Sequence, residues 1–277
     1  MAKRITSTIV LWLGVFAVLW FFRTNGAIVV IVGTSVLTLR ELYRMMAAAG
    51  NAPFSGLGLV FGGLITLAPW TEARYGIAAH PLLALAAVVF SIRMLVERPP
   101  EKRVEALSST LFGLVYISVL MQYLVRIATP LPGDAVSADG RLVLCLWVVA
   151  VAKFCDVGAL LSGLAWGRHP MAPLTSPKKT WEGAAGGVLV ATGVGALVAW
   201  LGRGVLPASL TPLRAALLAA PVAAVAIVSD LVESVIKRRA ALKDSGGGVP
   251  GIGGIFDLSD SLILAAPVAF FLLQRLG

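Results

Sequence analysis

The stretch SDLVESVIKRRAALKDSGGGVPGIGGIFDLSDS, from Ser229 to Ser261, separates two apolar runs near the end of this 277-residue chain. Acidic residues open and close the stretch, basic residues crowd its first half, and glycines fill its second half. Asp and Glu are rare inside or beside membrane spans unless they pair or serve a function. The stretch therefore predicts a polar site between two helices of a membrane protein.

The composition places the whole chain in a membrane. Hydrophobic residues make up 58% of the sequence and charged residues only 13%, with a mean hydropathy of +0.90, whereas a soluble domain usually carries about 25% charged residues. We expect an all-α polytopic protein with about nine transmembrane helices, eight and ten being alternatives. The expected spans are 7–22, 26–42, 54–70, 78–96, 107–126, 142–163, 184–202, 213–232 and 260–275.

The lysines indicate how the chain is oriented. With nine spans and a cytoplasmic N-terminus, all seven lysines fall on or near the cytoplasmic side, as the positive-inside rule expects. They are Lys3, Lys102, Lys153, Lys178, Lys179, Lys237 and Lys243. Both charged blocks, 167–182 and 237–257, then face the cytoplasm, and the membrane is predicted to be a bacterial inner membrane. The formal charge of +9 fits an anionic ligand or lipid surface, and nucleic acid is not expected as a partner.

The two parts of the chain differ in their chemistry. Residues 1–130 form a run of spans with one charged loop at 97–105, and we expect them to be a transmembrane scaffold. Residues 131–277 hold the charged blocks and are expected to form the catalytic region of the same integrated membrane domain. Cys145 and Cys155 form no C-x-x-C pair, so neither a disulfide framework nor a cysteine metal centre is predicted. A homodimer is an alternative that the sequence leaves open.

Carboxylates recur at helical spacing on both sides of the glycine-rich segment. Asp230, Glu233 and Lys237 stand at i, i+3 and i+7, and Asp257 and Asp260 at i and i+3, so each set shares one helix face. Clustered carboxylates suit Mg²⁺, which completes its shell with water and substrate phosphates. The alternative is a flexible cytoplasmic loop with a basic flank, but acidic residues on both sides favour a site for phosphate and metal.

Glycines and lysines supply the groups that bind phosphate. Glycines let backbone N–H groups approach phosphate oxygens closely, and the glycine-rich segment runs from Gly246 to Gly254. A second block, SPKKTWEG from Ser176 to Gly183, sets two lysines beside a helix that Thr180 is expected to cap. Lys153 and Asp156, three residues apart near the expected cytoplasmic end of the sixth span, are expected to neutralise each other.

Both blocks together resemble the phosphatidate cytidylyltransferase family, also called CDP-diacylglycerol synthases, over roughly residues 150–265. The family signature S-x-x-K-R-x4-K-D-x5-P-G-H-G-G-x-x-D-R-x-D is matched by Ser234, Lys237, Arg238, Lys243, Asp244, Pro250, Gly251, Gly253, Gly254, Asp257 and Asp260. The segments CDVGALLSG, which begins at Cys155, and SPKKTWEG are similar to a second stretch of the family. Two positions depart from the signature, with Ile252 in place of His and Leu258 in place of Arg.

The resemblance implies that CTP and phosphatidate react to give CDP-diacylglycerol and pyrophosphate, with Mg²⁺ as cofactor and a second cation as an alternative. It implies Asp230 and Asp257 as metal ligands and Asp260 and Glu233 as further candidates. It also implies catalytic roles for Asp230, Asp257, Lys237 and Lys243. The implied substrate-binding residues are Lys178, Lys179, Arg238, Asp244, Gly251, Gly253, Gly254 and Asp156.

Three other functions are weighed against this one. A CTP-dependent kinase of a polyprenol-type lipid would release CDP, whereas a cytidylyltransferase releases pyrophosphate. A catalytically altered or silent relative that binds anionic lipid is suggested by Ile252 and Leu258. A secondary transporter would place acidic residues near the bilayer midplane and show repeated halves, and the sequence shows no such repeat.

Overall fold

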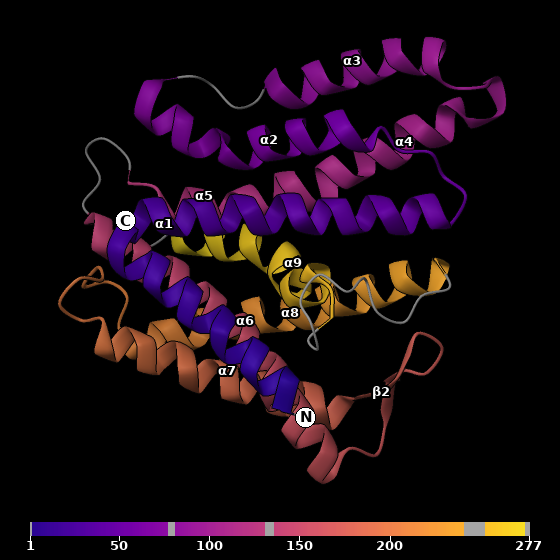
Figure 1. The fold of residues 1–277 in the computed structure, drawn as a ribbon. Helices are drawn as coiled ribbons and strands as arrows, with labels where there is room; N and C mark the ends of the chain where they lie inside the picture. The colour runs from indigo at the N-terminus through magenta and orange to yellow at the C-terminus, as the bar shows by residue number, and fades with distance from the viewer. Residues whose placement is uncertain (1, 77–80, 131–135, 241–252, 275–277) are drawn as a thin grey trace. The chain divides into compact units, whose positions relative to one another are not determined.

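The computed structural model describes residues 2–76, 81–130, 136–240 and 253–274, with side chains from residue 13 onward. In these residues the chain is almost wholly helical, with one two-stranded sheet, so the expected all-α class is confirmed (Figure 1). The chain divides into two compact units. The first unit comprises Met1–Arg126 and Lys237–Ser259, and the second comprises Ile127–Ile236 and Asp260–Gly277.

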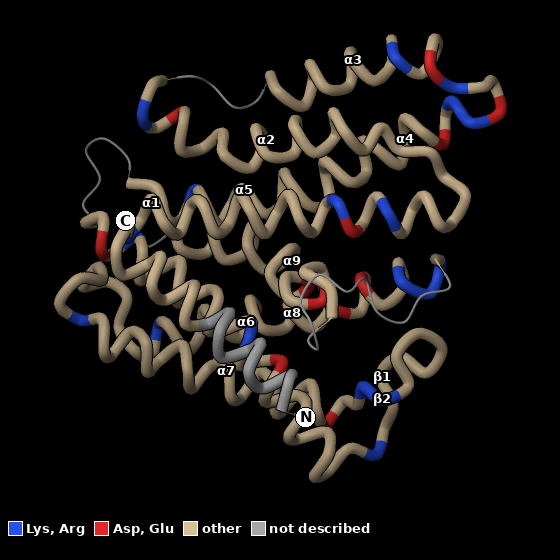
Figure 2. The backbone as a smooth tube through the Cα atoms, in the orientation of Figure 1, with Lys and Arg blue, Asp and Glu red and all other residues tan. Residues whose placement is uncertain are grey.

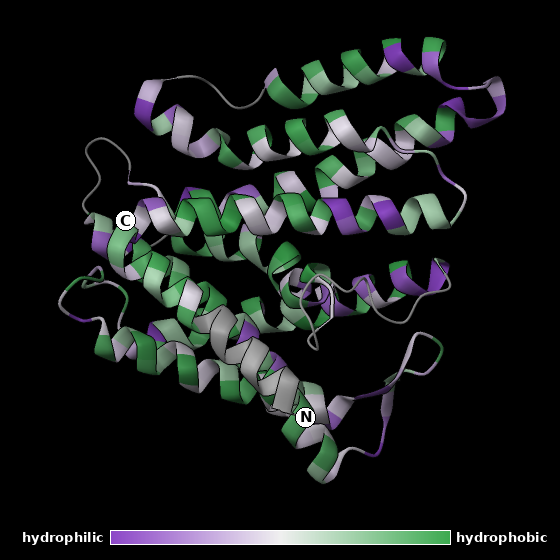
Figure 3. Ribbon diagram, in the orientation of Figure 1, coloured by the Kyte–Doolittle hydropathy of each residue, from purple (hydrophilic) through white to green (hydrophobic). Residues whose placement is uncertain are grey.

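Six helical stretches among the described residues are long and apolar enough to cross a membrane. They are Leu13–Ala48, Pro100–Ala128, Ala138–Trp166, Trp181–Leu201, Pro212–Arg239 and Ile255–Leu273. Hydrophobic residues cover most of their length, and hydrophilic residues gather toward their ends and in the connections (Figure 3). The chain is therefore a polytopic membrane protein. The expected count of nine also includes α2 (Ser55–Tyr75) and α3 (Pro81–Glu97) and divides α1 (Ala2–Ala48) into two spans.

Helix α1 runs through the boundary that the sequence predicts between the first two spans. At Arg23 the backbone leaves helical geometry, with φ 45° and ψ −125°, so two helical arms meet there at a kink. A Cβ atom on Gly26 would lie only 2.5 Å from the carbonyl oxygen of Val18. The polar segment 23–26 thus forms a kink in one long helix, and glycine is the residue that fits its inner side.

In the first unit, α2, α4 (Arg103–Gly113) and the π-helical turn η2 (Leu114–Val119) pack against α1, and α3 packs against α2 and α4. Between α3 and α4 lies η1 (Pro100–Lys102), and α5 (Leu120–Ala128) follows η2. The hydroxyl of buried Tyr43 donates to the carbonyl of Thr110 at 2.8 Å. Side chains at Gly58 or Gly113 would collide with the Tyr43 ring. Many charged residues of this part of the unit lie around the connection between α3 and α4, and others lie on α1 and at the end of α2 (Figure 2).

The second unit is built on close contact between α6 (Ala138–Trp166) and α7 (Trp181–Leu201). Small residues recur at every fourth position on the buried side of α7, and such residues let two helix backbones approach closely in a membrane. They are Gly183, Gly187, Ala191, Gly195 and Ala199. The indole N–H of Trp147 on α6 donates to the carbonyl of Gly195 at 3.0 Å. This packing fixes α6 and the start of α7 relative to each other.

A β-hairpin joins α6 to α7, where the sequence predicts only a loop. Strands β1 (Pro170–Ala172) and β2 (Ser176–Thr180) are antiparallel, with Pro170 opposite Thr180. Thr180 then caps α7, as expected, because its hydroxyl accepts from the amide of Gly183 at 3.1 Å. The hairpin places Lys178 and Lys179 on β2 immediately before α7. Two further helices complete the unit, α8 (Pro212–Arg239) and α9 (Ile255–Leu273), each of which also extends into the first unit.

Candidate active site

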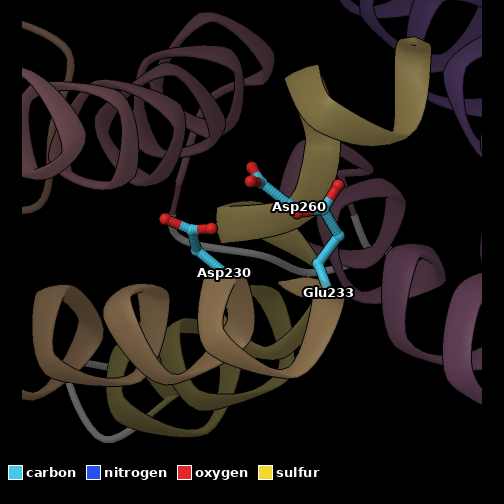
Figure 4. A group of neighbouring side chains, drawn as sticks. All are labelled: Asp230, Glu233 and Asp260. Atoms are coloured by element: carbon cyan, nitrogen blue, oxygen red, sulfur yellow. The ribbon is translucent and has the colours of Figure 1, made fainter. Parts of the chain in front are cut away.

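Three carboxylates of the second unit, two of them buried and one partly exposed, lie close together. Asp230 and Glu233 lie one turn apart on α8, and Asp260 lies on α9. One carboxylate oxygen from each residue lies within 4.8 Å of the others, and Figure 4 shows the side chains of Asp230 and Glu233 extending from α8 toward the segment of α9 that carries Asp260. Glu233 is 1% exposed and Asp260 is 8% exposed. We call Asp230, Glu233 and Asp260 the acidic cluster.

Two lysines from other elements neutralise part of this charge. The ammonium group of Lys179 on β2 forms an ion pair with Asp230. The ammonium group of Lys153 on α6 lies 3.1 Å from an oxygen of Asp156 and 3.5 Å from an oxygen of Asp260. The expected Lys153–Asp156 pair is therefore present. It lies near the middle of α6, however, and not near its end, because ten residues of helix follow Asp156.

Two serines fix the part of α9 that carries Asp260. The amide of Ser261 donates to the Asp260 carboxylate at 2.6 Å, and its hydroxyl donates to Asp156 at 2.9 Å. Ser229 on α8 donates to the carbonyl of Asp260 and accepts from the amide of Leu264 at 3.2 Å. Sequence reasoning gave Ser229 no role, because a buried serine beside an aspartate carries no spacing signal of its own.

A pocket of about 380 Å³ opens beside the cluster, between α6, the hairpin, α7 and α8. Its polar lining is Asp156, Ser176, Lys178, Lys179, Thr180 and Asp230. Its apolar lining includes Leu160, Leu164, Met171 and Ile227. Leu160 and Leu164 are 62% and 77% exposed, so this wall continues onto an apolar outer surface. Cations and carboxylates thus stand at one part of the pocket and hydrocarbon at another, an arrangement that suits an amphiphilic ligand with a phosphate head.

The start of α9 forms a second polar group, within the first unit. Asp257 pairs with Lys237 at 2.9 Å and accepts from the amide of Gly254 at 2.9 Å. Gly253 has φ 122°, and a Cβ there would lie 2.8 Å from the Asp257 carboxylate, so glycine is needed at this approach. Buried Glu41 of α1 accepts from the amide of Phe256 at 2.9 Å. The sequence predicts residues 41–44 as an interfacial anchor at the end of the second span, and it does not predict the contact of Glu41 with α9.

The remaining expected residues divide into two sets. Arg238 is exposed on the last turn of α8, and Gly254 is buried at the start of α9. Lys243, Asp244, Gly251 and Ile252 lie outside the described residues. The expected convergence of Asp230 and Asp257 would join the two units and stays a prediction. Within the second unit, Asp156, Lys179, Asp230, Glu233 and Asp260 come together as one network of ion pairs and neighbouring carboxylates.

A contact between His169 and Glu182 closes the base of the hairpin. His169 Nδ1 lies 2.5 Å from a carboxylate oxygen of Glu182, and the other oxygen of Glu182 accepts from the amides of Arg168 and His169 at 3.1 and 3.2 Å. The amide of Trp181 donates to the carbonyl of His169 at 3.0 Å. These contacts hold the strand that carries Lys178 and Lys179 against the first turn of α7.

Comparisons with known proteins give one family match and several similar proteins with the same name. The family model described as "Cytidylyltransferase family" matches residues 2–276. A phosphatidate cytidylyltransferase of Synechocystis sp. is 31% identical over 271 residues, covering 91% of this chain and 88% of the relative. A phosphatidate cytidylyltransferase of Mycobacterium leprae is 28% identical, covering 95% of this chain and 84% of the relative. A chloroplastic phosphatidate cytidylyltransferase of Arabidopsis thaliana is 29% identical, covering 99% of this chain and 72% of the relative.

Proposed function

The chain belongs to the cytidylyltransferase family, and from this premise we propose that its second unit carries the chemistry of CDP-diacylglycerol synthesis. The enzyme is a nucleotidyltransferase that acts on CTP and phosphatidate and forms CDP-diacylglycerol and pyrophosphate. The observation that carries the assignment to this site is a set of carboxylates and lysines beside a pocket with an apolar wall.

The reaction needs two polyanions to be brought together. A phosphate oxygen of phosphatidate attacks the α-phosphorus of CTP, and the bond from that phosphorus to the bridging oxygen of pyrophosphate breaks. The attacking oxygen already bears negative charge, so no side-chain nucleophile is required. Catalysis then depends on alignment and on neutralising charge. Lys178 and Lys179 line the pocket and supply positive charge there.

The acidic cluster fits the divalent metal that the reaction class implies. Its three oxygen donors converge within 4.8 Å, and hard carboxylate oxygens are the donors that Mg²⁺ prefers. Asp230, Glu233 and Asp260 would hold the ion, which would neutralise and orient the triphosphate of CTP. Asp257, which is paired with Lys237 in the first unit, is retained as a further ligand, and a second cation stays part of the proposal.

Lys179 links the metal ligands to the pocket. It pairs with Asp230 and also lines the pocket wall together with Lys178. A cation bound at Asp230 would compete with this ion pair, leaving the Lys179 ammonium available to a substrate phosphate. The lysine thus serves both the carboxylates and the anionic substrate. The apolar residues Leu160 and Leu164 would receive the acyl part of phosphatidate from the surrounding lipid.

The proposal includes nine spans, with the N-terminus and the site on the cytoplasmic side of a bacterial inner membrane. The distribution of the lysines other than Lys153, which lies near the middle of α6, supports this orientation. Matches to bacterial phosphatidate cytidylyltransferases support the membrane. CTP is a cytoplasmic nucleotide, so a cytoplasmic site also meets its substrate directly.

Product analysis of the purified protein tests the proposed function. Detergent-solubilised protein is incubated with CTP labelled at the α-phosphate, phosphatidate and Mg²⁺. We expect label in the lipid extract and one pyrophosphate released per labelled lipid. With CTP labelled at the γ-phosphate, a kinase acting on an added polyprenol would label that lipid and release CDP. Absence of lipid label with both nucleotides would indicate a silent relative and would contradict the proposal.

A further inference from the structure

Lys153 stands in an unusual place for a lysine. It is the sixteenth of the 29 residues of α6, a helix long and apolar enough to span a membrane. A charged residue at such a position is rare unless it pairs or has a function. Its side chain is only 25% exposed. The reaction described above uses Lys178 and Lys179 and leaves Lys153 without a part.

The contacts of Lys153 reach well beyond a local ion pair. On its own helix it lies 3.1 Å from Asp156, which would be enough to neutralise that carboxylate. It also donates to the hydroxyl of Ser261 at 2.7 Å and lies 3.5 Å from Asp260, both on α9. Ser261 in turn donates to Asp156 at 2.9 Å. Lys153 therefore joins α6 to the segment of α9 that carries a member of the acidic cluster.

We infer that Lys153 is a positioning residue that holds Asp260 in place and, by its fixed positive charge, lowers the affinity of the acidic cluster for a divalent cation. The inference rests on the proposed metal-holding role of the cluster. An ammonium group next to one ligand repels a cation bound to that ligand, while it orders the carboxylate through contacts on both helices. Weaker binding of the free cation would favour its arrival together with the triphosphate, whose charge offsets the repulsion.

The sign of the effect on metal affinity distinguishes this role from a purely structural one. Lys153→Met keeps an unbranched side chain up to the ε position and removes the ammonium group. Substrate-free protein should then bind Mn²⁺ at least about tenfold more tightly, since a unit charge within a few ångströms of a bound ion has a large effect on its binding energy. The variant should also show a lower kcat, because Asp260 loses a contact that orders it. Lys153→Arg keeps the charge and should restore the affinity to within about threefold of wild type.

Electron paramagnetic resonance titration of the full-length, metal-free protein in detergent, without nucleotide, measures Mn²⁺ binding directly. Lys153→Gln, which keeps a hydrogen-bond donor but no charge, serves as a second neutral variant if Lys153→Met does not fold, and the same tighter binding is expected. Lys102→Met removes an equal charge from the exposed turn η1 and should leave binding unchanged. Melting temperatures of all variants are measured alongside.

Two adverse outcomes are distinguishable. In the first, the wild-type protein binds Mn²⁺ and Asp260→Asn abolishes that binding, but the neutral Lys153 variants bind Mn²⁺ no more tightly than wild type. This result would overturn the role of Lys153 and leave the metal-holding role of the cluster in place. Wild-type binding that survives Asp260→Asn would overturn both this inference and the metal-holding role of the cluster. Tighter binding in the neutral variants, restored by Lys153→Arg, would support the inference.

Discussion

Single carboxylates are central to the proposed chemistry, because each is held where an unpaired charge is costly. Asp260 lies 8% exposed and accepts from the Ser261 amide at 2.6 Å, while Lys153 lies 3.5 Å from it. Asp230 pairs with Lys179. Breaking one partner of a buried pair is strongly destabilising. Ionisable residues in the spanning helices of a membrane protein support the hypothesis of a functional site there.

Replacing Asp260 with Asn tests whether the negative charge of this one carboxylate is needed for activity. The amide has the shape of the carboxylate but lacks its charge, so Mg²⁺-dependent lipid labelling should fall by about 10²–10³-fold, the usual loss when one electrostatic contact of a transition state is removed. Glu101→Gln, in the exposed turn η1, removes an equal charge and should leave turnover unchanged. Size-exclusion profiles of both variants check that they fold. Turnover close to wild type in Asp260→Asn would remove this residue from the site.

Sequence spacing predicted the members of the cluster better than it predicted their partners. Asp230, Glu233 and Asp260 recur at helical intervals in the sequence, and the structure brings all three together. The contact between Lys153 and Ser261 joins residues 108 positions apart, so no local pattern could reveal it. Lys179 was expected to bind phosphate, but its ion pair with Asp230 depends on how the hairpin folds.

At the level of elements, the sequence was enough to predict the apolar helices and the cap of α7, but it was not enough to predict the two short strands. The predicted span 184–202 corresponds to α7, Trp181–Leu201, and Thr180 caps it as expected. The hairpin was missed because β1 and β2 have only three and five residues, and prolines occur at 170, 173 and 177. Proline within a short run argues against a strand unless the strand is an edge, and both strands of a two-stranded sheet are edges.

Two glycines of α7 form a matched test of the α6–α7 contact. A Cβ on Gly187 would lie 2.8 Å from the carbonyl oxygen of Cys155, whereas a Cβ on Gly193 has open space around it. Gly187→Ala should destabilise the protein by about 1–3 kcal/mol through overpacking. Gly193→Ala should leave stability unchanged or raise it by up to about 1 kcal/mol, since alanine favours helix. Thermal unfolding in detergent measures both, and equal shifts would contradict the close approach of the two helices.

For the whole molecule, composition was enough to predict the class, and the family signature was enough to predict the reaction. The polytopic all-α class is confirmed by six helical stretches of spanning length among the described residues. The family and the activity are confirmed by a match over residues 2–276 and by relatives aligned over most of the chain. The count of nine spans and the cytoplasmic orientation stay predictions, because length and hydropathy do not fix the direction of a helix.

Labelling of single cysteines tests the orientation. Leu174 at the hairpin tip is 97% exposed, and Gly204 is exposed beyond the other end of α7, a helix of 21 residues or roughly 30 Å. A membrane-impermeant maleimide should label Leu174→Cys in inside-out vesicles and Gly204→Cys in right-side-out vesicles. The native cysteines are buried, so their background should be low. The reverse pattern would place the hairpin outside the cell and contradict a cytoplasmic site.

The most direct measurement is the position of a bound metal. Crystals or particles of the protein with Mn²⁺ and a non-hydrolysable CTP analogue would show the ion, through anomalous scattering or density. We predict one Mn²⁺ bounded by the carboxylates of Asp230, Glu233 and Asp260, with the triphosphate of the analogue in contact with it and with Lys179. A nucleotide-bound ion held by other residues, with all three carboxylates remote from it, would contradict the account.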